Sequence, residues 1–140
     1  MNLEAKANGQ AMRRTGWVLS GIVIAFMVAD VGATLLAIEP VKKATLETGY
    51  PLGLLWLIGA LELICLALYA IPATSVFGAI ILTGFLGGAI TSHLRVAGTL
   101  TPEMMVSLLV GVLAWGGLWF RDPRLRALIP RRRDAVPRIG

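Results

Sequence analysis

The sequence predicts an all-α integral membrane protein, a bundle of four transmembrane helices that cross the bilayer up-down-up-down. Composition is the first reason, because 56% of the 140 residues are hydrophobic and only 15% are charged, whereas soluble domains carry about 25% charged residues. A soluble core of this size could not bury so much apolar surface. The second reason is spacing: apolar residues gather in four runs, each about long enough to cross a bilayer, at residues 17–38, 52–71, 75–97 and 104–120.

The first run, residues 17–38, is interrupted only by Asp30. Its strongly apolar residues together outweigh the cost of about 3 kcal/mol for one central aspartate. The apolar stretch is too long for a secretory signal peptide, and no small-residue cleavage site follows it, so a retained helix is predicted. Residues 1–12, which precede it, are polar and are expected to form a disordered tail.

The first connector, residues 39–51, is polar and has room for one short interfacial helix. The second run, residues 52–71, contains Glu62 and is followed by Pro72. Only three residues then precede the third run, residues 75–97, and a link that short predicts an antiparallel helical hairpin.

The fourth run, residues 104–120, is the shortest and lies at the lower limit for a spanning helix. We therefore expect residues 13–130 to form one four-helix membrane domain, followed by a basic tail at residues 131–140.

The basic residues predict that both termini lie in the cytoplasm. Ten of the thirteen precede position 15 or follow position 120, and the other three are Lys42, Lys43 and Arg95. Excess lysine and arginine mark the cytoplasmic side of membrane proteins. Basic ends around an uncharged middle also argue against a nucleic-acid partner and favour membrane lipids.

With this orientation the aromatic residues are expected to form belts at the two membrane surfaces. The inner belt would hold Trp17, Tyr69, Trp115 and Trp119, and the outer belt Tyr50 and Trp56. In the third run, small residues centred on Gly84, Gly87 and Gly88 form a stripe. Small residues let helices approach closely in lipid, so we expect this stripe to be the central packing face of the bundle.

Four ionisable groups within or near the spans are the candidate site: Asp30, Glu62, His93 and Arg95. Charged groups are costly in the membrane, which makes each a functional candidate by default. The rise per residue puts the two carboxyls about 12 and 15 Å from the outer ends of their helices, and the other two groups within about 6 Å. All four thus fall in the outer half.

This convergence predicts an outward-facing polar pocket in which Asp30 and Glu62 meet His93 or Arg95, with Thr91 nearby. Such a group could relay protons or hold a polar head group, such as the oxygens of a quinone. His93 is about 200° from Arg95 around a regular helix, so the two should not enter one pocket. The alternative without a ligand is that these charged groups only hold the helices together.

Several chemistries are excluded by what the chain lacks. The single cysteine, Cys65, excludes an internal disulfide and a Cys-x-x-Cys redox pair, and the single histidine excludes a bis-histidine haem within one chain. No catalytic triad and no metal-ligand spacing is found, so no catalytic residue and no metal is assigned. We do not expect catalysis by this chain on its own.

Several segments resemble a known family in order and spacing: residues 16–21 with Asp30, residues 46–51, residues 61–63, the glycine-rich residues 79–89 running on through 93–96, and residues 121–126. Over roughly residues 13–130 the chain resembles the DoxX-like family of small four-helix bacterial membrane proteins. The family takes its name from the membrane subunit of a thiosulfate:quinone oxidoreductase.

The resemblance implies a redox- or quinone-associated subunit of the bacterial inner membrane, with a protein partner or a homo-oligomer. Because Cys65 has no second cysteine beside it, a redox role would need a partner subunit or a bound small molecule. Two alternatives stay open. One is a component of a small-solute transporter, and the other is a structural protein that assembles membrane complexes through the glycine stripe and holds no ligand.

Overall fold

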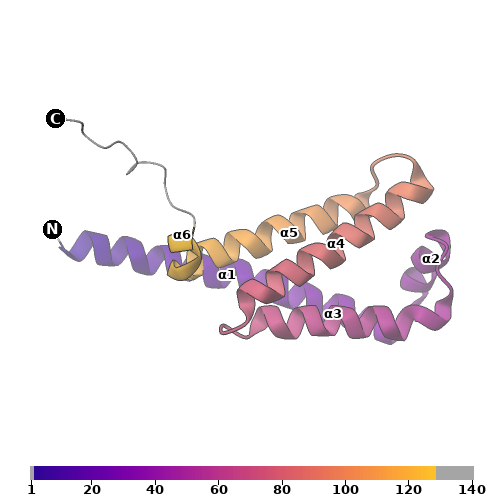
Figure 1. The fold of residues 1–140 in the computed structure, drawn as a ribbon, viewed down its shortest axis with the longest axis horizontal. Coiled ribbons are helices and arrows are strands. Elements are labelled where there is room, and N and C mark those ends of the chain that lie inside the picture. Colours follow the sequence, from indigo (N-terminus) through magenta and orange to yellow (C-terminus); the bar gives the residue numbers. More distant parts are fainter. Residues whose placement is uncertain (1, 129–140) are drawn as a thin grey trace.

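The computed structural model describes residues 2–128, with the side chains of residues 7–127. These residues form helices and no strand (Figure 1). In chain order the elements are α1 (Asn2–Leu35), α2 (Glu39–Glu47), the 3-10 turn η1 (Leu52–Leu54), α3 (Leu55–Ala70), α4 (Ser75–Ala97), α5 (Pro102–Arg121) and α6 (Pro123–Leu128).

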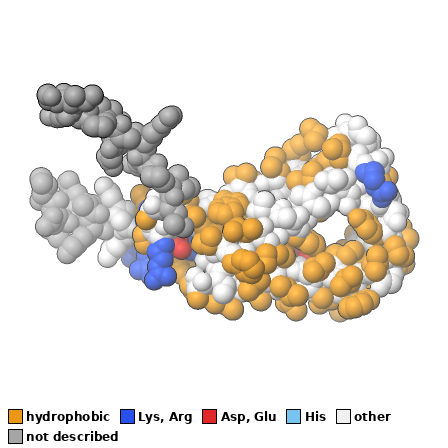
Figure 2. Space-filling view, viewed as in Figure 1, with side chains coloured by type: hydrophobic (Ala, Val, Ile, Leu, Met, Phe, Trp, Pro, Cys, Tyr) orange, Lys and Arg blue, Asp and Glu red, His pale blue; other side chains and the backbone are white. Residues whose placement is uncertain are grey.

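Four stretches are long and apolar enough to cross a membrane: Ala7–Leu35, Leu52–Ala70, Ser75–Ala97 and Pro102–Arg121. Only about a third of the most apolar part of each is buried inside the chain. The rest is an apolar surface that runs along the bundle (Figure 2), and lipid solvates such a surface where water would not. The predicted all-helical membrane fold with four spans is confirmed.

The four long helices form a closed ring of contacts, in which α1 and α4 each pack against both α3 and α5. Neighbours in the ring run in opposite directions. The first part of α1 lies against the last part of α5, where Gly16 meets Arg121, and the first turn of α4 lies against the last turn of α3, where Gly78 meets Tyr69. The N-terminal part of α1, the α3–α4 turn and α6 thus lie at one end of the bundle (Figure 1).

Glycines in three helices permit these close approaches. A Cβ on Gly16 or Gly78 would overlap the backbone of the neighbouring helix, and one on Gly117 would overlap Ser20. Small residues act here as expected in membrane bundles, although at positions that the sequence did not single out.

The stripe of Gly84, Gly87 and Gly88 does not have this role within the chain. A Cβ on any of the three would meet no atom within 4 Å in the described structure. The prediction that the stripe is the central packing face of the bundle is therefore wrong. The motif shows that a close approach is possible but not which neighbour makes it, and α4 turns this face outward. A role in packing against another molecule stays a prediction.

Two further features differ from the prediction. The sequence predicted a disordered tail at residues 1–12, and α1 instead begins at Asn2. Residues 2–12 are rich in strong helix formers and extend an existing helix, so they bear no nucleation cost. The short helix expected in the first connector is present as α2, whereas α6 was not predicted. The basic tail, residues 131–140, lies outside the described residues.

The other end of the bundle is open. The tip of the α4–α5 hairpin diverges there from α2 and α3 (Figure 1), and the space-filling view shows a hollow between them with acidic surface inside it (Figure 2). Two hydrogen bonds tie the connector after α2 to α4 across this opening. Arg95 Nη2 donates to the carbonyl oxygen of Thr48 at 2.9 Å, and the hydroxyls of Tyr50 and Ser92 are 3.0 Å apart.

Candidate functional site

Two carboxyl groups meet near the open end, one from α1 and one from α3. The Asp30 carboxyl and the Thr34 hydroxyl, one helical turn apart on α1, are the side-chain groups that interact with the Glu62 carboxyl. Glu62 is only 5% exposed and Thr34 only 4%, while Asp30 is half-buried. Gly59, one turn before Glu62, lets α3 lie directly against α1 at this level. The two carboxyls therefore lie side by side, one from each helix.

The carboxyl pair has no cationic partner in the part of the chain with described side chains. The ion pairs found there, Lys42 with Glu39 and Lys43 with Glu47, both lie on α2. In addition, Glu62 Oε2 is buried without any hydrogen-bond partner. A buried carboxyl left this way is costly. Glu62 Oε2 therefore lacks a hydrogen-bond donor among the described residues, and the pair lacks a positive charge beside it.

Arg95 and His93 do not fill this need. The Arg95 guanidinium is held by the Thr48 carbonyl and lies against Gly49, whose φ of 83° and missing side chain leave room for it. His93 is near Glu103, on the neighbouring helix α5. The two residues contact different neighbours on a continuous α4, as their angular separation predicted, but neither forms an ion pair with a carboxyl of the site.

The expected encounter of the carboxyls with Arg95 or His93 is thus corrected. Its physical reason is the divergence of the α4–α5 tip, which moves the end of α4 away from α1 and α3 and gives Arg95 a backbone carbonyl as its acceptor. Thr91, the fifth candidate, is exposed, and its hydroxyl donates to the Gly87 carbonyl in its own helix at 2.9 Å. Of the five candidate residues, only Asp30 and Glu62 lie together, with Thr34 beside them.

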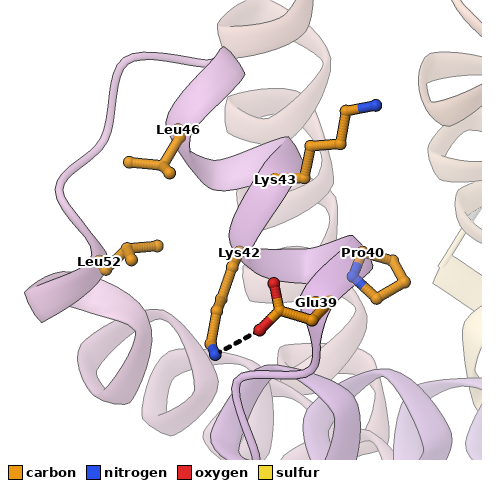
Figure 3. Close-up of a pocket in the computed structure, with 6 residues that line it drawn as sticks. All are labelled: Glu39, Pro40, Lys42, Lys43, Leu46 and Leu52. Carbon is orange, nitrogen blue, oxygen red and sulfur yellow. Dashed lines mark hydrogen bonds and ion pairs between the residues drawn. The ribbon is translucent and has the colours of Figure 1, made fainter.

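A shallow hollow on α2 is a weaker candidate (Figure 3). It is lined by Glu39, Pro40, Lys42, Lys43, Leu46 and Leu52. Lys42 Nζ is already paired with Glu39 Oε1 at 2.7 Å, and Lys43 points away from it (Figure 3). No buried polar atom in its lining lacks a hydrogen-bond partner, unlike Glu62 Oε2 in the carboxyl pair.

A second buried polar cluster lies toward the other end of the bundle, and the sequence did not reveal it. The Tyr69 hydroxyl donates to Ser20 Oγ at 3.2 Å and to the Ala114 carbonyl at 3.0 Å. Arg121 Nη2 donates to the Tyr69 carbonyl at 3.1 Å. Tyr69 is fully buried, so its expected place in the inner aromatic belt is wrong. The available signal was a serine and a tyrosine at similar depth in two neighbouring helices.

The comparisons with known proteins bear on this arrangement. The sequence matches the DoxX-like family over residues 18–117, a segment that contains Asp30, Glu62 and most of the four long helices. The chain belongs to the DoxX-like family. Neither a curated protein nor a solved structure matches it.

The candidate site of this DoxX-like protein is a pair of carboxyl groups. Cys65 is buried and unpaired, and within the described residues no three metal-ligating side chains gather closely enough to hold an ion. A carboxyl pair in an apolar surrounding can accept hydrogen bonds, exchange protons or hold a positive charge. Those are the functions that this site supports.

Proposed function

We propose that this DoxX-like protein is a redox-associated membrane subunit that binds a small lipophilic molecule, a quinone above all, at Asp30 and Glu62. The observation that carries the proposal is the buried Oε2 of Glu62, which has no partner and lies beside a second carboxyl. A hollow is visible at the open end (Figure 2), and we propose that a ligand reaches the carboxyl pair from there.

The residues of the site fit a quinone in its reduced form. A quinol carries hydroxyl groups that donate hydrogen bonds, and it supplies electrons and protons together when it is oxidised. Glu62 Oε2 would accept one such hydrogen bond, and the half-buried Asp30 would take up a released proton and pass it to the hollow. Thr34 would hold the Glu62 carboxyl in place. The electrons would go to a partner subunit, because we assign no redox centre to this chain.

The orientation in the membrane is part of the same proposal. Both termini would lie in the cytoplasm, with the four spans crossing the inner membrane up-down-up-down and the carboxyl hollow opening outward. The excess of basic residues near the two chain ends supports this orientation. A C-terminal reporter that is active only in the cytoplasm tests it, and activity only outside the cell would reverse the assignment of the hollow.

The binding proposal is tested with Glu62→Gln and Asp30→Asn, two variants that keep shape and remove acidity. Binding of a short-chain ubiquinol to the purified protein should weaken at least tenfold in each, with little change in melting temperature. Glu47→Gln is the matched control, because Glu47 is an exposed carboxylate on α2, and it should bind like the unmodified protein. Unchanged binding in Glu62→Gln, or a loss explained by lower stability alone, would contradict the proposal.

The alternative of a small-solute transporter is less well supported by the packing. Below Glu62 the centre of the bundle is filled by apolar side chains that are almost fully buried, among them Met27, Val23 and Leu82. The Tyr69 hydroxyl beyond them is already engaged by Ser20 and Ala114. A transport pathway would require this column to open, and proton-driven solute flux in liposomes would be the observation in its favour.

The assembly role is favoured by one observation, the outward face of Gly84, Gly87 and Gly88 with open space beside it. Replacing Gly84 and Gly88 with leucine should then break up a complex that co-purifies with the protein. A complex that survives both replacements would contradict this role.

A further inference from the structure

Arg121, at the end of α5, is a buried cation whose nearby carboxylate is that of the next residue, Asp122. It is 8% exposed, and its Nη1 is buried without a hydrogen-bond partner. The guanidinium lies 4.8 Å from the centre of the Trp17 ring and 5.2 Å from that of Tyr69. No ion pair within the described side chains reaches it. Aromatic rings offset part of the charge, but a guanidinium fork is best satisfied by a carboxylate or a phosphate.

The surface around Arg121 is strongly basic. Five arginines with described side chains lie at this end of the bundle, against one aspartate: Arg13, Arg14, Arg121, Arg124 and Arg126. The aspartate, Asp122, already accepts a hydrogen bond from the Arg124 amide at 2.8 Å. Figure 2 shows the basic side chains gathered beside α6. Among the described side chains, positive charge is therefore in clear excess at this surface.

A hollow next to Trp17 can receive negative charge. Its lining is Gln10, Arg13, Arg14, Trp17 and Val18. Trp17 thus has one face toward the Arg121 guanidinium and also borders the hollow. The polar part of the lining comes from the two arginines and the glutamine, and the apolar part from Val18, which is 61% exposed at the start of the membrane span.

Along α1 the cationic groups come first and the apolar groups follow in the direction of the membrane. A phospholipid is the ligand class with this order of groups. A phospholipid presents a phosphate followed by acyl chains in the same direction, and the end of α5 is where head groups of that leaflet are expected. A free phosphate would leave the apolar wall unused.

We propose that Trp17, Arg13, Arg14 and Arg121 form a binding site for the head group of an anionic phospholipid. The two exposed arginines contact the phosphate, and the lipid charge stabilises the buried Arg121 across the Trp17 ring. Because Gly16 packs directly on Arg121, the bound lipid strengthens the contact between α1 and α5. This site is independent of the carboxyl pair.

The test compares lipid-dependent stabilisation of the purified protein in detergent. Phosphatidylglycerol should raise the melting temperature by several degrees more than phosphatidylcholine, and native mass spectrometry should detect the retained anionic lipid. The double variant Arg13→Gln/Arg14→Gln should lose most of this difference, and its lipid affinity should fall about tenfold. Arg121→Gln should do the same where it folds; the exposed double variant decides the matter where it does not.

The matched control is Lys42→Gln/Lys43→Gln, which removes the same number of charges at the opposite end and should keep the full response. Equal stabilisation by the two lipids would overturn the proposal, as would equal loss in the control and in the arginine double variant. Glycerol phosphate without acyl chains should have no effect, and a full response to it would show a simple anion site in place of a lipid site.

Discussion

Replacing Glu62 with methionine should make the ligand-free protein more stable while it abolishes binding. The buried Oε2 of Glu62 has no partner. Removing this atom from water therefore destabilises the folded state, and no hydrogen bond compensates for it. Methionine fills a similar volume, adapts to its surroundings and needs no partner. Asp30, which would lose its neighbour, is only half-buried and can still be hydrated.

The expected gain follows from the cost of one unsatisfied buried polar group, about 1–3 kcal/mol, less a small loss of the Thr34 interaction. We expect a net increase of about 1 kcal/mol in the free energy of unfolding. Reversible unfolding in mixed detergent micelles measures it, with Glu47→Met as the control for a carboxylate lost from an exposed position. The control should change stability by less than about 0.5 kcal/mol.

This experiment separates a ligand site from a structural pair. If the two carboxyls only fasten α1 to α3, removing one must weaken the bundle. A drop in stability of 1 kcal/mol or more in Glu62→Met, with an unchanged control, would therefore refute the reasoning from the unpartnered oxygen. Increased stability together with lost ubiquinol binding is the result that the site predicts.

Three further predictions concern the bundle itself. Gly78→Val should lower the free energy of unfolding by about 3 kcal/mol or more, because its side chain would overlap the α3 backbone at Tyr69. Gly84→Val should be nearly neutral. The melting temperatures of the two purified variants measure both effects. Tyr69→Phe should cost about 1–3 kcal/mol by leaving Ser20 and the Ala114 carbonyl without their donor, measured by unfolding in the same micelles. Arg95→Gln should speed hydrogen exchange in residues 48–51 while the spans keep their protection, because the connector loses its tie to α4; an unchanged exchange rate would contradict that role.

The sequence predicted the long elements well for a simple reason. A spanning helix must satisfy all its backbone groups in lipid, so its length can be read from the apolar run. The third run agrees at both ends, Ser75 and Ala97, because a three-residue turn precedes it and Gly98, with a φ of 63°, ends it. The start of α1 was missed because helix propensity, rather than apolar length, determines it.

The rotation of each helix about its axis was much less predictable. In a soluble protein the apolar face is the buried face, but in a membrane the core and the lipid are both apolar. Depth alone nevertheless predicted that Asp30 and Glu62 lie near each other, since both are costly to expose to lipid, and the two carboxyls do interact. The same reasoning put Tyr69 in a surface belt and Gly84 in the core, and the structure reverses both. Arg95 was assigned to a carboxylate because no sequence signal marks a backbone carbonyl as its acceptor.

Two buried groups in the bundle have a polar atom without a hydrogen-bond partner, one acidic and one basic, and they lie far apart along the helices. Glu62 is a buried acid near the open end, and Arg121 is a buried cation near the chain ends, with apolar core and the engaged Tyr69 between them. If they served only stability, pairing them or replacing each with an apolar residue would be better, because a buried charge without a partner costs more than a hydrophobic substitute. Neither solution is used. Because Glu62 Oε2 and Arg121 Nη1 find no hydrogen-bond partner among the described residues, we propose a ligand of matching chemistry for each: a hydrogen-bond donor for the carboxyl pair, and an anionic head group for the arginine.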